Sequence, residues 1–108
     1  MKLVVAIVQD NDAAKLRQEL TKQGFKSTKL SSTGGFLREG NTTFLVGVED
    51  EAVWHVKALI HKVCKERTKL APSNQYFNGG ESMYAEPVEV QVGGAVVFVL
   101  ALDEMVRL

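Results

Sequence analysis

The sequence predicts an α+β fold in which two helices cover one antiparallel sheet, in the split order βαββαβ. Two observations support this prediction. Strand-like apolar runs alternate with helical patterns along most of the 108 residues. The two halves also repeat weakly at an offset of 40 residues, since residues 6–10 resemble residues 46–50 in pattern. A chain of this length fits one domain, which we place at residues 1–108.

The first predicted unit is a strand followed by a helix. Residues 3–8 form a continuous apolar run rich in β-branched residues, which is typical of a buried central strand. Asp10 or Asn11 is expected to cap the helix that follows. Gly24 is expected to end that helix in a left-handed conformation. The apolar stripe of this helix consists of Ala13, Leu16 and Leu20.

The second unit begins with two further strands, predicted at residues 25–30 and 42–48. Acidic residues 49–51 then favour the start of a second helix, because negative charge is stabilising at a helix N-terminus. Three basic residues are assigned to its C-terminal end: Lys65, Arg67 and Lys69. Its apolar face consists of Val53, Val56, Leu59, Ile60 and Val63.

The C-terminal third begins with an irregular stretch at residues 71–86, which is long for a compact domain and therefore indicates a functional or a disordered loop. Its two tyrosines argue against a mere solvated linker. Residues 87–92 alternate between apolar and polar. Gly93-Gly94 then predicts a two-residue hairpin turn into a return strand at residues 95–100. The return strand is apolar throughout, so both of its faces need cover, which another subunit could supply.

Composition limits the kinds of partner. Thirteen basic and thirteen acidic residues give a formal net charge of zero, which argues against nucleic-acid polymers and anionic membranes. A small anionic ligand needs only a local cluster of donors. The one cysteine excludes an intrachain disulfide, and no apolar run approaches the ~20 residues of a membrane span. We therefore expect a cytoplasmic protein that does not associate with a membrane.

The segment Thr33-Gly34-Gly35-Phe36 is the strongest candidate for ligand binding. Paired glycines let successive backbone N–H groups point to one side, which suits a phosphate, and an adjacent aromatic ring can stack on a base. The same residues could equally turn a corner, with Phe36 in the core. Lys26 and Thr28 would share one face of the preceding strand and could donate to a phosphate.

Catalytic and metal-binding patterns are weak in this chain. His61 and Cys64 lie three residues apart on the second helix, but no further metal ligand is evident nearby. Burial in the core is the better interpretation of Cys64. No serine, cysteine or lysine stands in a recognisable nucleophile context. The sequence therefore predicts a protein that is not an enzyme and has no catalytic residue, metal or cofactor.

Five stretches together resemble the bacterial PII-like cyclic-di-AMP receptors, and they span nearly the whole chain. They include Thr-Gly-Gly-Phe-Leu, Gly-Asn-Thr-Thr-Phe and Val-Gly-Gly-Ala, and lie at residues 1–10, 28–30, 32–37, 40–44 and 87–95. The resemblance implies a ferredoxin-like subunit, a homotrimer, and three ligand sites in the clefts between subunits. The short gap between Phe36 and Thr42 and the long connection at residues 71–86 match this branch rather than the nitrogen-sensing PII proteins.

The resemblance also implies which residues contact cyclic di-AMP. Thr28 would meet the phosphate–sugar ring, Asn41 would hydrogen-bond near the base, and Gly47 would leave room for close approach. Lys26 stands where the family has arginine, so the contact keeps its charge and loses the bidentate fork. The final residues 106–108 also depart from the family pattern. The full expected set is Lys26, Thr28, Gly35, Phe36, Leu37, Asn41, Gly47, Gly93, Gly94 and Phe98.

The sequence thus predicts a nucleotide-binding signal transduction protein whose ligand is cyclic di-AMP. Ligand bound between subunits would alter loop conformations that an unknown downstream protein reads. Two alternatives remain open from the sequence: an ATP-binding regulator of the PII type, and a metal-binding trimer of the same fold.

Overall fold

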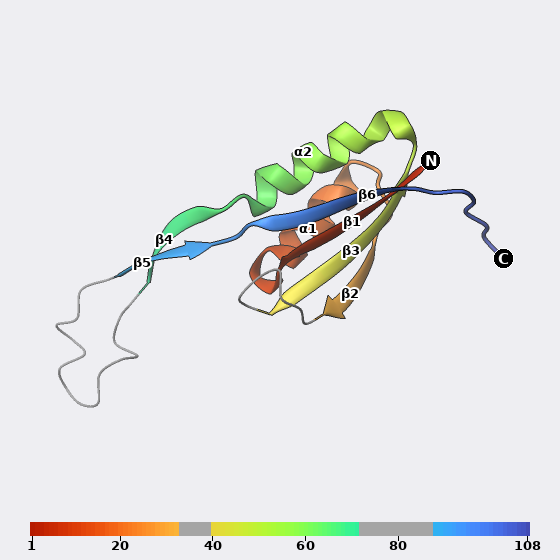
Figure 1. Ribbon diagram of the computed structural model, residues 1–108. Helices are drawn as coiled ribbons and strands as arrows, with labels where there is room; N and C mark the ends of the chain where they lie inside the picture. Colours follow the sequence, from red (N-terminus) through yellow and green to blue (C-terminus); the bar gives the residue numbers. More distant parts are fainter. Residues whose placement is uncertain (33–39, 72–87) are drawn as a thin grey trace.

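The computed structural model describes residues 1–32, 40–71 and 88–108, and within them four strands form one antiparallel sheet. The order in this sheet is β2-β3-β1-β6, and β4 and β5 pair separately as a two-stranded ribbon. Figure 1 shows both helices against one face of the sheet and the ribbon projecting beyond it. The elements are β1 (Lys2–Gln9), α1 (Asp10–Lys22), β2 (Thr28–Ser32), β3 (Asn41–Val48), the 3-10 turn η1 (Asp50–Ala52), α2 (Val53–Cys64), β4 (Arg67–Ala71), β5 (Val88–Val92) and β6 (Ala95–Ala101).

The sheet has the split arrangement that the sequence predicts. β1 and β2 are both antiparallel to β3, which lies between them, so the β1–α1–β2 unit is a crossover with one strand inserted. β6 pairs antiparallel with the other edge of β1 and completes the sheet. The mixed α+β architecture is therefore confirmed, and its topology is compatible with a ferredoxin-like fold.

The core lies between the sheet and the two helices. Alternate side chains of β1 and β3 face the helices, and Phe44 is fully buried among them. The apolar stripes predicted for α1 and α2 are confirmed, since Leu16, Leu20 and Val56 are fully buried. The complete cluster is Val4, Ala6, Val8, Ala13, Leu16, Leu20, Phe44, Val46, Val48, Val56, Leu59, Ile60 and Cys64.

On the opposite side of the sheet, here called the open face, none of the described residues forms a helix (Figure 1). Strand register places Val5 between Leu45 and Phe98 on this side, and the same alternation continues along each strand. Leu30, Phe98 and Leu100 on the open face are 46%, 41% and 49% exposed. An antiparallel sheet whose second face meets water normally carries polar residues there, so these exposed apolar side chains are unusual for such a face.

The start of α1 differs from the prediction. Asp10 is already the first helical residue, and Gln9 occupies the cap position without a side-chain cap bond. The Asp10 carboxylate instead accepts a hydrogen bond from the Thr42 hydroxyl at 2.6 Å, while the Asp10 N–H donates to the Gly40 carbonyl at 2.9 Å. A tertiary contact has thus replaced the local cap.

The second strand begins three residues later than predicted, at Thr28 instead of Phe25. The end of α1 explains the delay: the Phe25 N–H donates to Leu20 O and the Gly24 N–H to Thr21 O, which together form a Schellman motif. Gly24 has φ +86°, as expected for a left-handed helix end. Phe25 therefore packs against the core as part of the helix end, and the prediction that Lys26 shares a strand face with Thr28 is wrong.

Two C-terminal predictions are also wrong. Arg67 and Lys69 do not extend α2, which ends at Cys64, but lie in β4. Gly93-Gly94 does not form a hairpin turn between paired strands, because β5 pairs with β4 and β6 pairs with β1. Both glycines have positive φ, +86° and +95°, and redirect the chain from the ribbon into the main sheet. The predicted C-terminal hairpin is thus replaced by a strand of the main sheet.

Candidate functional site

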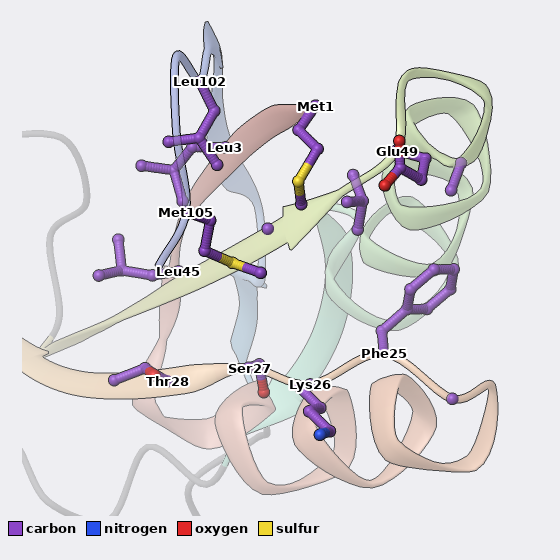
Figure 2. A pocket seen from close by; sticks show the side chains of 14 residues that line it. Met1, Leu3, Phe25, Lys26, Ser27, Thr28, Leu45, Glu49, Leu102 and Met105 are labelled. Carbon is purple, nitrogen blue, oxygen red and sulfur yellow. The ribbon is translucent and has the colours of Figure 1, made fainter. Parts of the chain in front are cut away.

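A pocket of about 630 Å³ opens where the start of β2 meets the end of β3. Figure 2 shows Lys26, Ser27 and Thr28 along one side and Met1 and Leu3 along the other. The side chain of Met105, from the segment after β6, lies across β3 in the same view. The lining residues are Met1, Leu3, Gly24, Phe25, Lys26, Ser27, Thr28, Leu45, Gly47, Val48, Glu49, Ala52, Leu102 and Met105.

Three residues of the predicted ligand set line this pocket: Lys26, Thr28 and Gly47. The Schellman turn after α1 positions Lys26, and pairing of Thr28 with Leu45 aligns β2 against β3. A Cβ atom at Gly47 would lie 3.5 Å from Met105 Sδ and 4.0 Å from Met1 Cε. The missing side chain therefore keeps space open between the strand and the two chain ends.

The polar groups of the pocket lie on its rim. Lys26 and Thr28 are exposed, so an ammonium group and a hydroxyl are available to an anionic group. Glu49 lines the same pocket and carries the opposite charge. A phosphate is therefore favoured at the Lys26 side, and the apolar walls of Leu3, Leu45 and Met105 suit a flat, weakly polar group such as a base.

Another group of predicted residues lies at the far end of β3. Asn41 pairs with Gln9 at the end of β1, and the Gln9 side-chain carbonyl accepts the Gly93 N–H at 2.7 Å. Asn41 and Gly47 are six residues apart on one strand, which corresponds to about 20 Å. Asn41 is only 3% exposed, so a ligand contact would require its surroundings to open. One chain does not bring Asn41, Gly93 and Gly94 to the pocket.

The remaining predicted residues fall into two classes. Phe98 lies on the open face opposite Val5 and does not line the pocket. Gly35, Phe36 and Leu37 lie outside the described residues. The residues that the sequence did not indicate include the apolar walls Met1, Leu3, Phe25 and Met105. No motif marks Met1, Leu3 and Met105, because only the strand order brings the two chain ends beside β3.

The residues considered as metal ligands lie elsewhere. His61 and Cys64 line a different hollow between α2 and β6. Among residues 1–32, 40–71 and 88–108, no three His, Cys, Asp or Glu side chains gather in a way that could hold a metal ion. Cys64 is fully buried, which agrees with its predicted place in the core. Burial raises the pKa of its thiol to about 12, helped by the Asp12 carboxylate and opposed by Arg67.

The raised thiol pKa predicts a loss of stability at high pH. The folded state keeps Cys64 protonated up to about pH 12, while the unfolded state ionises from its ordinary pKa of 9.0. The stability contribution is therefore complete below pH 9.0 and is lost progressively as the pH rises towards 12. Between pH 8 and pH 10.5 the expected loss is about 2 kcal/mol, measured by urea unfolding.

Cys64→Ala is the control for this pH dependence, because lysines and tyrosines titrate in both proteins. The slope of stability against pH should be shallower in the variant. Equal slopes would show that the thiol ionises as easily in the folded protein as in the unfolded chain.

The described residues thus form a small α+β protein with a pocket whose lining suits a nucleotide-like ligand. A family model described as cyclic-di-AMP receptor matches residues 1–108, the whole chain. The chain therefore belongs to the cyclic-di-AMP receptor family, as the resemblance in its sequence predicted. Membership in a receptor family favours binding over catalysis, and no catalytic family is indicated.

A solved structure supports the same fold. The chain is similar to a functionally unknown protein from Pediococcus pentosaceus ATCC 25745, with 44% sequence identity and a TM-score of 0.81. The similarity covers 99% of this chain and 96% of that one. Of the helices in the described part of the chain, none has the length and apolar character needed to cross a membrane.

Proposed function

We propose that this protein is a cytoplasmic receptor for cyclic di-AMP that works as a homotrimer, with one ligand in each cleft between subunits. The observation that carries the proposal is the family match over all 108 residues. The pocket supports it, because Lys26, Thr28 and Gly47 supply a positive charge, a hydroxyl donor and open space together.

The distribution of the predicted ligand residues supports a site shared between subunits. Lys26, Thr28 and Gly47 lie at one end of β3, and Asn41 lies at the other with Gly93 nearby. The separation along β3 is about 20 Å, so one ligand would not reach both groups within a single chain. A cleft in which one end of a subunit meets the opposite end of its neighbour would bring the two groups to the same ligand.

The open face supports assembly. Phe98 and Leu100 are exposed there, beside strand partners that are also apolar. Contiguous apolar surface of this kind marks a protein interface. A trimer would cover this face, and the number of subunits rests on the resemblance. The expected mass in solution is about three times the 11.9 kDa of one chain, measured by light scattering.

Isothermal titration calorimetry with cyclic di-AMP, cyclic di-GMP and ATP tests the proposal. We expect saturable binding of cyclic di-AMP with one site per chain, and binding of the other two nucleotides at least about tenfold weaker, equivalent to 1.4 kcal/mol. Tight ATP binding with weak cyclic di-AMP binding would support the PII-type energy sensor instead. No saturable heat with any of the three nucleotides would overturn the proposed function.

The signalling step would depend on loops outside the main sheet. A bound ligand can shift a conformational equilibrium only if it binds one conformation more tightly than the other. The β4–β5 ribbon connects to residues 72–87, which form the longest irregular stretch of the sequence and lie outside the described residues. We assign the recognition of a downstream protein to the β4–β5 ribbon and the residues that it joins.

A further inference from the structure

The first turn of α1 contacts both the start of β3 and the base of the β4–β5 ribbon. Gln9, Asp10 and Asp12, here called the junction, lie within four residues of one another at the β1–α1 connection. Asp10 contacts the start of β3, whereas Gln9 and Asp12 contact the base of the ribbon. One short segment therefore connects the predicted ligand residues around Asn41 with the ribbon to which we assign partner recognition.

On the ribbon side, Asp12 holds Arg67 of β4 in a two-pronged ion pair. Arg67 Nη2 donates to Asp12 Oδ1 at 2.8 Å, and Nη1 donates to Oδ2 at 3.4 Å. Asp12 is 5% exposed, so this pair is less screened by water than a surface pair. Arg67 Nη1 also donates to Lys65 O at 3.1 Å, which fixes the guanidinium at the start of the strand.

The second ribbon strand is held through Gln9. The Gln9 side-chain carbonyl accepts the Gly93 N–H at 2.7 Å. This contact is buried and joins residues that lie 84 positions apart in the sequence. The next residue, Gly94, donates its N–H to Cys64 O at the end of α2. A two-stranded ribbon has little stability of its own. Its direction therefore depends on these contacts at its base.

On the β3 side, Asp10 binds the residues around Asn41. Its N–H donates to Gly40 O at 2.9 Å, and its carboxylate accepts the Thr42 hydroxyl at 2.6 Å. Gly40 directly follows residues 33–39, which include three of the predicted ligand residues and lie outside the described part of the chain. A displacement of Gly40 or Thr42 would therefore act directly on the first turn of α1.

We propose that the junction couples ligand binding near Asn41 to the conformation of the β4–β5 ribbon. The coupling rests on the proposed function, because it assigns a regulatory route to that same ligand site. A ligand that shifts the Gly40–Thr42 backbone moves Asp10, and α1 transmits this shift through Asp12 to Arg67 and through Gln9 to Gly93. The ribbon is the element whose equilibrium changes.

Hydrogen exchange of the full-length protein tests the junction without ligand. Asp12→Asn keeps the side-chain shape and removes the charge, and Arg67→Ala removes the partner. Ribbon amides at residues 67–71 and 88–92 are expected to exchange about tenfold faster in both variants, because losing a hydrogen bond between charged groups raises the population of the open ribbon. Lys15→Ala is the control, since it removes an ion pair between the exposed Lys15 and the partly buried Glu19 on the same helix.

The β2 and β3 amides report whether each variant still folds, and they should exchange as in the unmodified protein. Ribbon exchange that is the same in Asp12→Asn, Arg67→Ala and the unmodified protein would overturn the proposal. Faster exchange with Lys15→Ala as well would also overturn it, because any loss of charge on α1 would then have the same effect.

The same measurement at saturating cyclic di-AMP tests the coupling. In the unmodified protein the ligand should change ribbon exchange by about threefold or more, and in Asp12→Asn less than half of that change should remain. The calorimetric affinity of Asp12→Asn should stay within about threefold, because Asp12 lines neither the pocket beside Gly47 nor the hollow beside Gly40. Binding without any change in ribbon exchange would overturn the coupling and leave the receptor function standing. Absence of binding in the unmodified protein would overturn the receptor function, while the ligand-free comparison would still decide whether the junction holds the ribbon.

Discussion

Gly93→Ala is expected to destabilise the protein by about 3 kcal/mol or more, because it combines backbone strain with a collision. Gly93 has φ +86°, a region that residues with a Cβ atom adopt only at a cost. An added Cβ would lie 2.6 Å from Lys65 O and 3.0 Å from Cys64 O, both of which are backbone atoms that cannot rotate away. The substitution would therefore push the base of the ribbon away from the end of α2.

The neighbouring glycine provides the matched control. Gly94 has φ +95°, but no atom lies within 4 Å of its added Cβ. Gly94→Ala should therefore show the backbone strain alone, about 1–2 kcal/mol. Both values follow from urea midpoints at one fixed protein concentration, since assembly makes stability concentration-dependent. Equal losses for the two variants would show that the contacts with Lys65 and Cys64 do not constrain Gly93.

Gly47→Leu is expected to weaken cyclic di-AMP binding by about 100-fold, because overfilling a packed site costs about 1–3 kcal/mol. The leucine side chain would project from β3 into the space beside Met105 and Met1. The fold should tolerate it, because Gly47 lies in a regular strand and is absent from the described glycines with positive φ. Calorimetry gives the affinity, and light scattering reports whether the assembly remains intact.

Gly47→Ala tests whether the size of the side chain, rather than the mere loss of glycine, determines the affinity at this position. Its Cβ would lie 3.5 Å from Met105 Sδ, an ordinary van der Waals distance, so the affinity should remain within about threefold. Unchanged binding in Gly47→Leu would place the ligand outside this pocket and contradict the assignment of Lys26 and Thr28 as its contacts.

Local sequence patterns were sufficient to predict the helices and strands that form the core. Leu16 and Leu20 on α1, and Val56 and Ile60 on α2, recur at helical spacing and are buried as predicted. The apolar run of β1 was also sufficient, because a continuous β-branched stretch has few other places in a small domain. These predictions succeeded because the residues that bury one face of a helix or strand lie only a few positions apart in the sequence.

The predictions that failed depended on contacts between distant residues. Gly93-Gly94 reads as a hairpin turn from its neighbours alone, and nothing nearby indicates that β5 pairs with β4 instead. Asp12 and Arg67 are 55 residues apart, so no local pattern connects them. Phe25 appeared to start a strand because aromatic residues are common in strands, whereas the Schellman bonds after Gly24 keep it at the end of α1.

The candidate site was predicted only in part for the same reason. Lys26, Thr28 and Gly47 were expected through the family resemblance, and the pocket brings them together. The apolar walls come from Met1, Leu3 and Met105, which the sheet order and the returning C-terminal segment assemble. Side chains of that kind carry no recognisable spacing in the sequence.

The position of Lys26 has a consequence for ligand affinity. The side chain is exposed and stands in the connection between α1 and β2, so neither the core nor the sheet depends on it. Substitutions at such a position usually change stability by less than about 0.5 kcal/mol. Under the proposed function, an exchange of lysine and arginine at this position would change the affinity for the ligand and leave the fold unchanged.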